Sequence, residues 1–96
     1  MKATEIKKEI REEYNSFVAL TNEKPCTASV MVEWEDGTRH NDVIAIEDGT
    51  DYANKNINDD DILYYVSDID SLLTMTEKNT MCEFVILDVL GFSADC

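Results

Sequence analysis

The residues of this chain that could support nucleophilic chemistry are one histidine and three cysteines. His40 could act as a base for a thiol only if folding brings it within hydrogen-bond reach of Cys26 or Cys82. Cys82 lies in the most apolar run of the chain, where a small buried thiol is the ordinary interpretation. The wide separation and odd number of Cys26, Cys82 and Cys96 fit no zinc site and favour reduced thiols in a cytosol. We therefore expect no catalytic residue and no enzymatic activity.

Oxygen ligands for a hard cation are abundant between residues 48 and 61, where aspartates and asparagines cluster. An EF-hand loop, however, needs glycine at its sixth position and a bidentate glutamate at its twelfth. Counted from Asn54, these positions hold Asp59 and Tyr65, so the pattern fails. The sequence contains only three glycines, which are too few and too scattered for a phosphate-cradling loop. We expect neither a metal site nor a cofactor.

The strongest chemical signal is the distribution of charge. The chain carries 21 acids and 8 bases, a formal net charge of −13. Residues 33–70 hold twelve of these acids, opposed only by Arg39 and Lys55, whereas acids and bases are equal in number over residues 1–24. A concentrated anionic field repels nucleic acids and membrane surfaces and attracts basic surfaces. The expected partner is therefore a basic protein, and direct binding to nucleic acid or to a membrane is disfavoured.

The spacing of these acids suits mimicry of a polyanion. Side chains two positions apart on a strand point the same way and lie about 6.8 Å apart, which matches two phosphate steps along one DNA strand. Glu33 and Glu35 have this relation next to a predicted turn. If the polar stretch of residues 47–60 folds beside that turn, the acids merge into one surface. The candidate partner-binding residues are Glu33, Glu35, Asp36, Glu47, Asp48, Asp51, Tyr52, Asp59, Asp60, Asp61, Asp68 and Asp70.

In length, isolated acidity and lack of a catalytic pattern, the chain is similar as a class to phage and mobile-element inhibitors, such as anti-CRISPR and anti-restriction proteins. It is similar in the same respects to immunity proteins that neutralise nucleases. The likeness concerns charge and length, not an alignable motif. It implies a non-enzymatic inhibitor that occupies the basic nucleic-acid-binding surface of its partner. Two alternatives stay open: the acids only solvate the surface, or an accessory or adaptor domain binds through an apolar sheet edge or helix face.

Hydrophobic periodicity predicts the elements that must position these residues. Ile6, Ile10, Tyr14 and Phe17 recur at helical spacing and predict a helix over residues 4–20. Residues 27–34 alternate between apolar and polar, which is typical of a half-buried strand.

Asp36-Gly37 then favours a two-residue type I′ turn, which pairs Trp34 with Arg39 and Glu33 with His40. In that register Arg39 stacks over Trp34, and Ile44 and Ile46 point away from the core unless a bulge near Asp42 shifts the strand. The predicted core face consists of Val30, Val32, Trp34, Val43 and Ala45.

The second half of the chain is predicted to form a long acidic loop followed by a strand, a helix and a strand. Residues 47–60 form the loop, and residues 62–66 form a short strand whose Tyr64 and Tyr65 face opposite ways. Ser67 and Asp70 resemble a capping box for a short helix, followed by a turn over residues 76–80. Residues 81–90 are the most apolar run and predict a central strand that ends at Gly91.

These elements predict one α+β domain over residues 1–96, in the order α-β-β-β-α-β. The expected sheet is mixed and four-stranded, the long N-terminal helix packs on one face, and the third and fourth strands run parallel. No apolar run is long enough to cross a membrane, and the charged N-terminal segment does not resemble a secretory signal. We expect a cytoplasmic monomer or homodimer.

Overall fold

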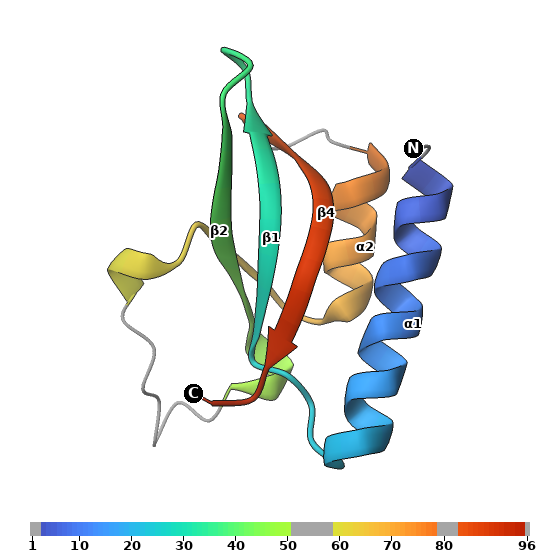
Figure 1. The fold of residues 1–96 in the computed structure, drawn as a ribbon. Helices are drawn as coiled ribbons and strands as arrows, with labels where there is room; N and C mark the ends of the chain where they lie inside the picture. Colours follow the sequence, from blue (N-terminus) through green and yellow to red (C-terminus); the bar gives the residue numbers. More distant parts are fainter. Residues whose placement is uncertain (1–2, 51–58, 79–82, 96) are drawn as a thin grey trace.

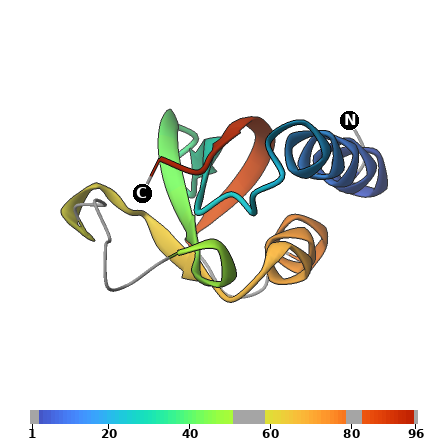
Figure 2. The same ribbon diagram turned by 90° about the horizontal axis from the view of Figure 1, so that it is seen from below.

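Two helices pack against one face of a four-stranded sheet (Figures 1 and 2). This computed structural model describes residues 3–50, 59–78 and 83–95. It confirms the predicted α+β class, the order α-β-β-β-α-β and the mixed sheet. The helices are α1 (Ala3–Thr21) and α2 (Ile69–Lys78), the strands are β1 (Thr27–Trp34), β2 (Arg39–Ile46), β3 (Tyr64–Val66) and β4 (Phe84–Ser93), and the 3-10 turns are η1 (Glu47–Gly49) and η2 (Asp59–Asp61).

The order of strands in the sheet is β3-β2-β1-β4. β1 pairs antiparallel with both β2 and β4, and β2 pairs parallel with β3. The predicted parallel direction of the third and fourth strands is therefore correct, although two strands separate them. The chain reaches β4 from β3 through α2, which crosses the sheet on the same face as α1 (Figure 2).

The core lies between this sheet face and the two helices. Ile10 of α1, Leu72 of α2 and Val30 of β1 are almost completely buried in it. Tyr14 contacts Phe92 of β4 edge-on, with ring centroids 5.8 Å apart. The helical spacing of Ile6, Ile10 and Tyr14 in the sequence thus produces the buried face of α1.

The predicted register of the β1–β2 hairpin is wrong by one residue. Glu33 pairs with Arg39 and Val32 with His40, because the turn has three residues instead of two. The Gly37 amide donates to the Trp34 carbonyl at 2.9 Å, and the Trp34 amide donates to the Thr38 carbonyl at 2.8 Å. Within the turn, Gly37 alone has a positive φ, +87°, which is the pattern of a type I turn followed by a glycine bulge.

A shift of one residue turns every β2 side chain to the other face of the sheet. Ile44 and Ile46 are completely buried in the core, whereas Val43 and Ala45 lie on the opposite face. The expected stacking of Arg39 on Trp34 is also wrong. The Trp34 ring packs on Phe84 with centroids 5.4 Å apart, and Arg39 Nε lies 3.3 Å from Glu33 Oε1.

The apolar run before the end of the chain forms an edge strand, not the predicted central strand. It extends past Gly91 to Ser93. The pairing of β1 with β4 shifts register twice, between Ser29 and Val30 and between Met31 and Val32, which inserts extra residues in β4. These bulges break the alternation of buried and exposed positions along β4. The sequence of this edge strand is therefore continuously apolar, although only one face of the sheet is covered by helices. The predicted turn over residues 76–80 is wrong at its start, because α2 continues to Lys78.

The expectation of three reduced thiols is wrong at Cys26, which is buried and disulfide-bonded. Cys26 directly precedes β1, and its amide donates to the Ser93 carbonyl at 2.8 Å. Cys82 and Cys96 lie outside the described residues. The odd number of cysteines and their wide separation in the sequence did not indicate this bond.

Candidate functional site

The hairpin turn and the start of β4 bring exposed carboxylates together at one end of the sheet. Glu35 and Asp36 belong to the turn, and the Glu35 amide donates to the Glu83 carbonyl at 3.2 Å. All three residues are exposed, and the hairpin projects beyond the rest of the molecule (Figure 1). We call Glu35, Asp36 and Glu83 the hairpin-tip cluster. The sequence analysis missed Glu83, whose only signal is a charge next to the apolar run of β4.

A shallow hollow of about 400 Å³ lies within the hairpin-tip cluster. Its apolar part is Trp34, which is half-buried because its ring packs on Phe84. Its polar part combines carboxylates with one hydroxyl and one imidazole. The hollow is lined by Trp34, Glu35, Asp36, Thr38, His40 and Glu83. An aromatic ring beside several carboxylates suits the approach of a cationic side chain.

The carboxylates of the hairpin-tip cluster differ in their hydrogen-bond and ion-pair partners. Hydrogen bonds from the Thr38 hydroxyl (2.6 Å) and the Thr38 amide (3.0 Å) hold the pKa of Asp36 below its usual value. Asp36 thus stays ionised and also fixes the turn. Among the described residues, Glu35 and Glu83 have no ion-pair partner, so their charge faces solvent. Glu33, one residue before Trp34, is instead engaged by Arg39.

A second group of predicted site residues lies at the opposite end of β2. Glu47 and Asp48 form the start of η1, and the Asp48 amide donates to the Ser67 carbonyl at 3.0 Å. This contact brings η1 next to the entry of α2, where Asp68 and Asp70 lie. Glu47, Asp48, Asp68 and Asp70 are called the helix-entry cluster here.

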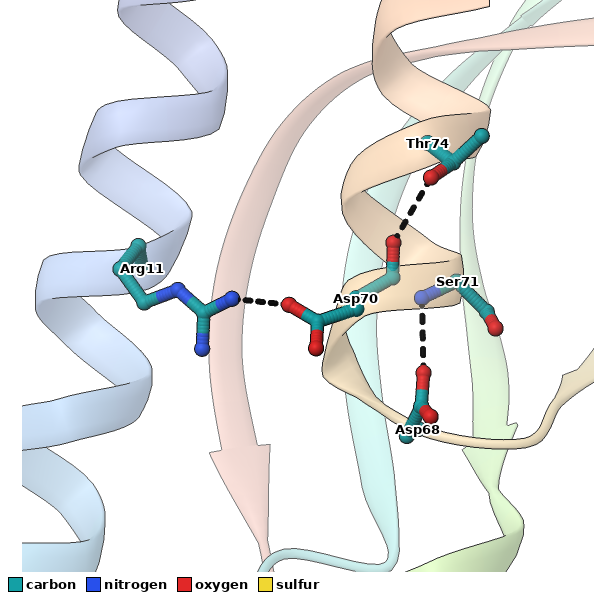
Figure 3. A network of polar contacts seen from close by, with 5 residues as sticks. All are labelled: Arg11, Asp68, Asp70, Ser71 and Thr74. Atoms are coloured by element: carbon teal, nitrogen blue, oxygen red, sulfur yellow. Dashed lines mark hydrogen bonds and ion pairs between the residues drawn. The ribbon is translucent and has the colours of Figure 1, made fainter.

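Carboxylates of the helix-entry cluster have partners within the fold, and Figure 3 shows those of Asp68 and Asp70. Asp70 forms an ion pair with Arg11 of α1. Asp48 forms a second ion pair, in which its Oδ2 atom lies 3.5 Å from Lys24 Nζ. Asp68 Oδ1 accepts a hydrogen bond from the Ser71 amide at 2.8 Å. Asp68 is therefore the N-cap of α2, and the predicted capping by Ser67 and Asp70 is wrong. Arg11 and Lys24 therefore partly neutralise the negative charge of the helix-entry cluster.

The role of Asp68 as the N-cap of α2 leads to a prediction about the stability of the fold. Hydrogen bonds from Ser71 hold the pKa of Asp68 below its usual value of 3.8. Because the folded-state pKa is the lower one, the stabilisation is complete above the unfolded-state pKa and is lost as pH falls through the folded-state pKa. We expect Asp68→Ala to lower the thermal midpoint at pH 7, and the difference from the wild type to shrink below about pH 4. Thermal melts followed by circular dichroism from pH 2 to 8 measure this, with exposed Asp61→Ala as the control. A constant difference at every pH would contradict the role of the carboxylate.

The remaining predicted residues belong to the segment before β3. Asp60 and Asp61 are exposed in η2, which lies beyond the β3 edge of the sheet (Figure 1). Asp51, Tyr52 and the side chain of Asp59 lie outside the described residues.

The described acids thus divide into separate groups instead of one surface around the turn. The eight residues of β2 separate the hairpin-tip cluster from the helix-entry cluster by about 25 Å. A further acidic group outside residues 33–70 was missed: burial raises the pKa of Glu13, and repulsion from Asp88 and Glu9 raises it further. Glu13 and Asp88 are far apart in sequence, so only the packing of α1 on β4 reveals this group.

The basic side chains of the described residues are largely matched with acids. Lys8 Nζ lies 4.0 Å from Glu12 Oε1, and Arg11 forms an ion pair with Asp70. Lys7, Lys8 and Arg11 line a hollow of about 450 Å³ between α1 and α2, with Asp70 among its other residues. This groove is of mixed charge and does not form the continuous basic stripe that phosphate binding requires.

No arrangement typical of a metal centre or a membrane span occurs in the described parts of the chain. Within residues 3–50, 59–78 and 83–95, no three His, Cys, Asp or Glu side chains lie together as metal ligands. Neither described helix combines the length and the apolar character needed to cross a bilayer.

Comparison with known proteins gives no relative: no family model, no curated protein and no solved structure matches this chain. The function of the chain has to be argued from its own residues.

Proposed function

We propose that this chain is a small acidic, non-enzymatic binding protein that inhibits a basic partner by occupying its nucleic-acid-binding surface. The observation that carries the proposal is the hairpin-tip cluster. Glu35 and Glu83 are exposed and have no cationic partner among the described residues, and Asp36 is held ionised beside them. A basic groove that normally accepts phosphates can accept carboxylates held at a projecting, rigid turn.

Two physical arguments support an inhibitor of this kind. Duplex DNA presents about one charge per 1.7 Å of helix axis, so only a dense cluster of carboxylates competes with it. The net charge of −13 adds long-range attraction, which raises the rate of association with a basic surface and makes binding sensitive to salt. Neither argument requires a catalytic residue or a cofactor.

The partner class that fits is a nuclease or another nucleic-acid-binding protein. An anti-CRISPR, an anti-restriction or a nuclease immunity function, encoded by a phage or mobile element, would each use such a surface. Action inside the cytoplasm, as a monomer or a homodimer, completes the proposal.

A second candidate function follows from the exposed apolar side chains. Leu90, in a bulge of the edge strand β4, is 51% exposed, and Tyr65 of β3 is 38% exposed. An adaptor domain could use such residues at the two edges of the sheet to bind an apolar surface. This binding would change little with salt, which separates it from the first proposal.

Affinity capture from the native host lysate tests both candidates. We expect the tagged protein to retain a nucleic-acid-binding protein at low salt, where attraction between exposed charges is weakly screened. Added salt weakens this attraction, since at 0.1 M it already fades beyond about 10 Å. The retained protein should be released at high salt and displaced by duplex DNA, as identified by mass spectrometry. Capture that resists both salt and DNA would favour the adaptor and contradict the inhibitor.

A further inference from the structure

The face of the sheet that lies away from α1 and α2 carries several apolar side chains. Both helices lie on one side of the sheet, and no described helix lies over the other side, which we call the open face (Figure 2). Alternation along β1 and β2 places on the open face the residues between the core positions, among them Met31 and Val43. Both side chains are half-buried, and neither belongs to the core.

β4 adds further apolar residues to the open face through its two bulges. At each bulge two residues of β4 lie opposite one residue of β1. The first extra residue is Leu87, next to the position that pairs with Met31, and the second is Leu90, next to the position that pairs with Ser29. Because Met31 and Ser29 belong to the open face, the two leucines lie there too. Val85 reaches the same face by ordinary alternation.

β4 is therefore apolar on both of its faces. An antiparallel strand with one solvated face normally alternates between apolar and polar residues. In β4, the residues Phe84, Ile86 and Val89 enter the core, and the bulge leucines lie on the open face. Leu90 and Tyr65 are two of the three large apolar side chains that the described residues expose, and Tyr65 of β3 is also on the open face. Covering this face would remove apolar surface from water.

The open face also carries little of the charge of the chain. Its described charged residues are Glu33, Arg39 and Asp88, and the first two form an ion pair with each other. Two acids and one base give this face a net charge of about −1, whereas the whole chain has −13. Two copies can therefore approach through their open faces without bringing their acidic clusters together.

The size of the open face fits a second copy of the chain. The sheet has four strands about 4.8 Å apart, three of them eight or ten residues long, which gives a face of about 500 Å². Two such faces bury about 1,000 Å² in total, the lower end for a specific interface and typical of weak association. We propose that the chain forms a homodimer in which two open faces pack against each other around a two-fold axis.

This dimer leaves the hollow of the hairpin-tip cluster open. Trp34 packs on the core residue Phe84, and His40 pairs with the core residue Val32, so both lie on the helix side of the sheet. Each dimer therefore presents two hairpin-tip clusters. Self-association and capture of a basic partner use different surfaces, so each can be tested without the other.

Sedimentation equilibrium of the purified chain, at about 10 µM to about 1 mM, measures the self-association. We expect a dissociation constant of about 100 µM, as befits a small interface. It should fall at least about tenfold between about 0.05 M and about 1 M sodium chloride, because salt screens the repulsion between two copies of net charge −13. Capture of a basic partner has the opposite salt dependence. A chain that stays monomeric throughout, or a dimer that weakens with salt, would overturn the proposal.

A matched pair of variants tests whether the open face is the interface. Leu90→Lys and Leu20→Lys each replace an exposed leucine and change the net charge equally, but Leu20 belongs to α1. We expect Leu90→Lys to weaken the dimer at least about tenfold, because it places a charge in an apolar interface. Leu20→Lys should leave the dimer as strong as the wild type or slightly stronger. Equal weakening by both variants would overturn the proposal; circular dichroism checks that each variant folds.

Dilution of the labelled wild type locates the interface without a substitution. Amide chemical shifts of Met31, Val43 and Leu87 should change between about 1 mM and about 10 µM, as the dimer dissociates. Shift changes confined to α1 and α2 would place the contact on the helices and overturn the proposal.

Discussion

Replacement of Glu35 and Glu83 by lysine lowers the affinity for the basic partner by about 100-fold, because like charges then face each other across the interface. Both side chains are exposed and without an ion-pair partner among the described residues, so the exchange breaks no contact of the fold. Asp36 is left unchanged, since its hydrogen bonds with Thr38 hold the turn. Titration of the captured partner at constant salt measures the change, with circular dichroism as the check of folding.

The matched control is Glu9→Lys with Glu23→Lys. These two acids are exposed and belong to α1 and the segment after it, so the net charge changes equally while the hairpin-tip cluster stays intact. We expect the control to lose only the small part of the affinity that depends on net charge. Equal losses in the two double variants would show that net charge, not the hairpin-tip cluster, attracts the partner.

Gly49→Ala has the largest expected effect on stability, a loss of about 3 kcal/mol in the free energy of unfolding. A Cβ atom at Gly49 would lie 2.6 Å from the Pro25 carbonyl carbon, closer still to its oxygen, and 3.1 Å from the Cys26 amide nitrogen. These backbone atoms are fixed, because the Ile46 amide donates to the Cys26 carbonyl at 2.7 Å. Urea unfolding measures the loss.

Gly91→Ala is the control for this substitution. Gly91 lies within β4, and a Cβ atom there would meet nothing within 4 Å. We expect a change below about 1 kcal/mol. A Gly49→Ala variant as stable as Gly91→Ala would contradict the close packing of η1 on the segment before β1.

The elements of this fold could be predicted from sequence because local signals specify them. The spacing of Ile6, Ile10 and Tyr14 predicts α1, and the alternation in residues 27–34 matches β1 at both ends. The register of β2 could not be predicted, because a two-residue and a three-residue turn both accept Asp36-Gly37. Burial of Ile44 and Ile46 favours the longer turn, and this preference comes from the core and not from the turn itself.

The candidate site could be predicted only in part. The density of acids in residues 33–70 drew attention to the hairpin, but proximity in sequence suggested a single surface. β2 carries the chain away from the turn, so Glu47 and Asp48 lie at the opposite end of the sheet. Glu83 joins Glu35 through the pairing of β4 with β1, a long-range contact that no local pattern contains.

The most direct test of the proposed function is capture from one lysate with three baits, each with and without excess duplex DNA. The baits are the wild type, the Glu35→Lys, Glu83→Lys variant and the Glu9→Lys, Glu23→Lys control. The proposal predicts a nucleic-acid-binding protein on the wild type and the control, displaced by DNA, and its absence from the hairpin-tip variant. Capture of the same protein by all three baits, undisturbed by DNA, would contradict it.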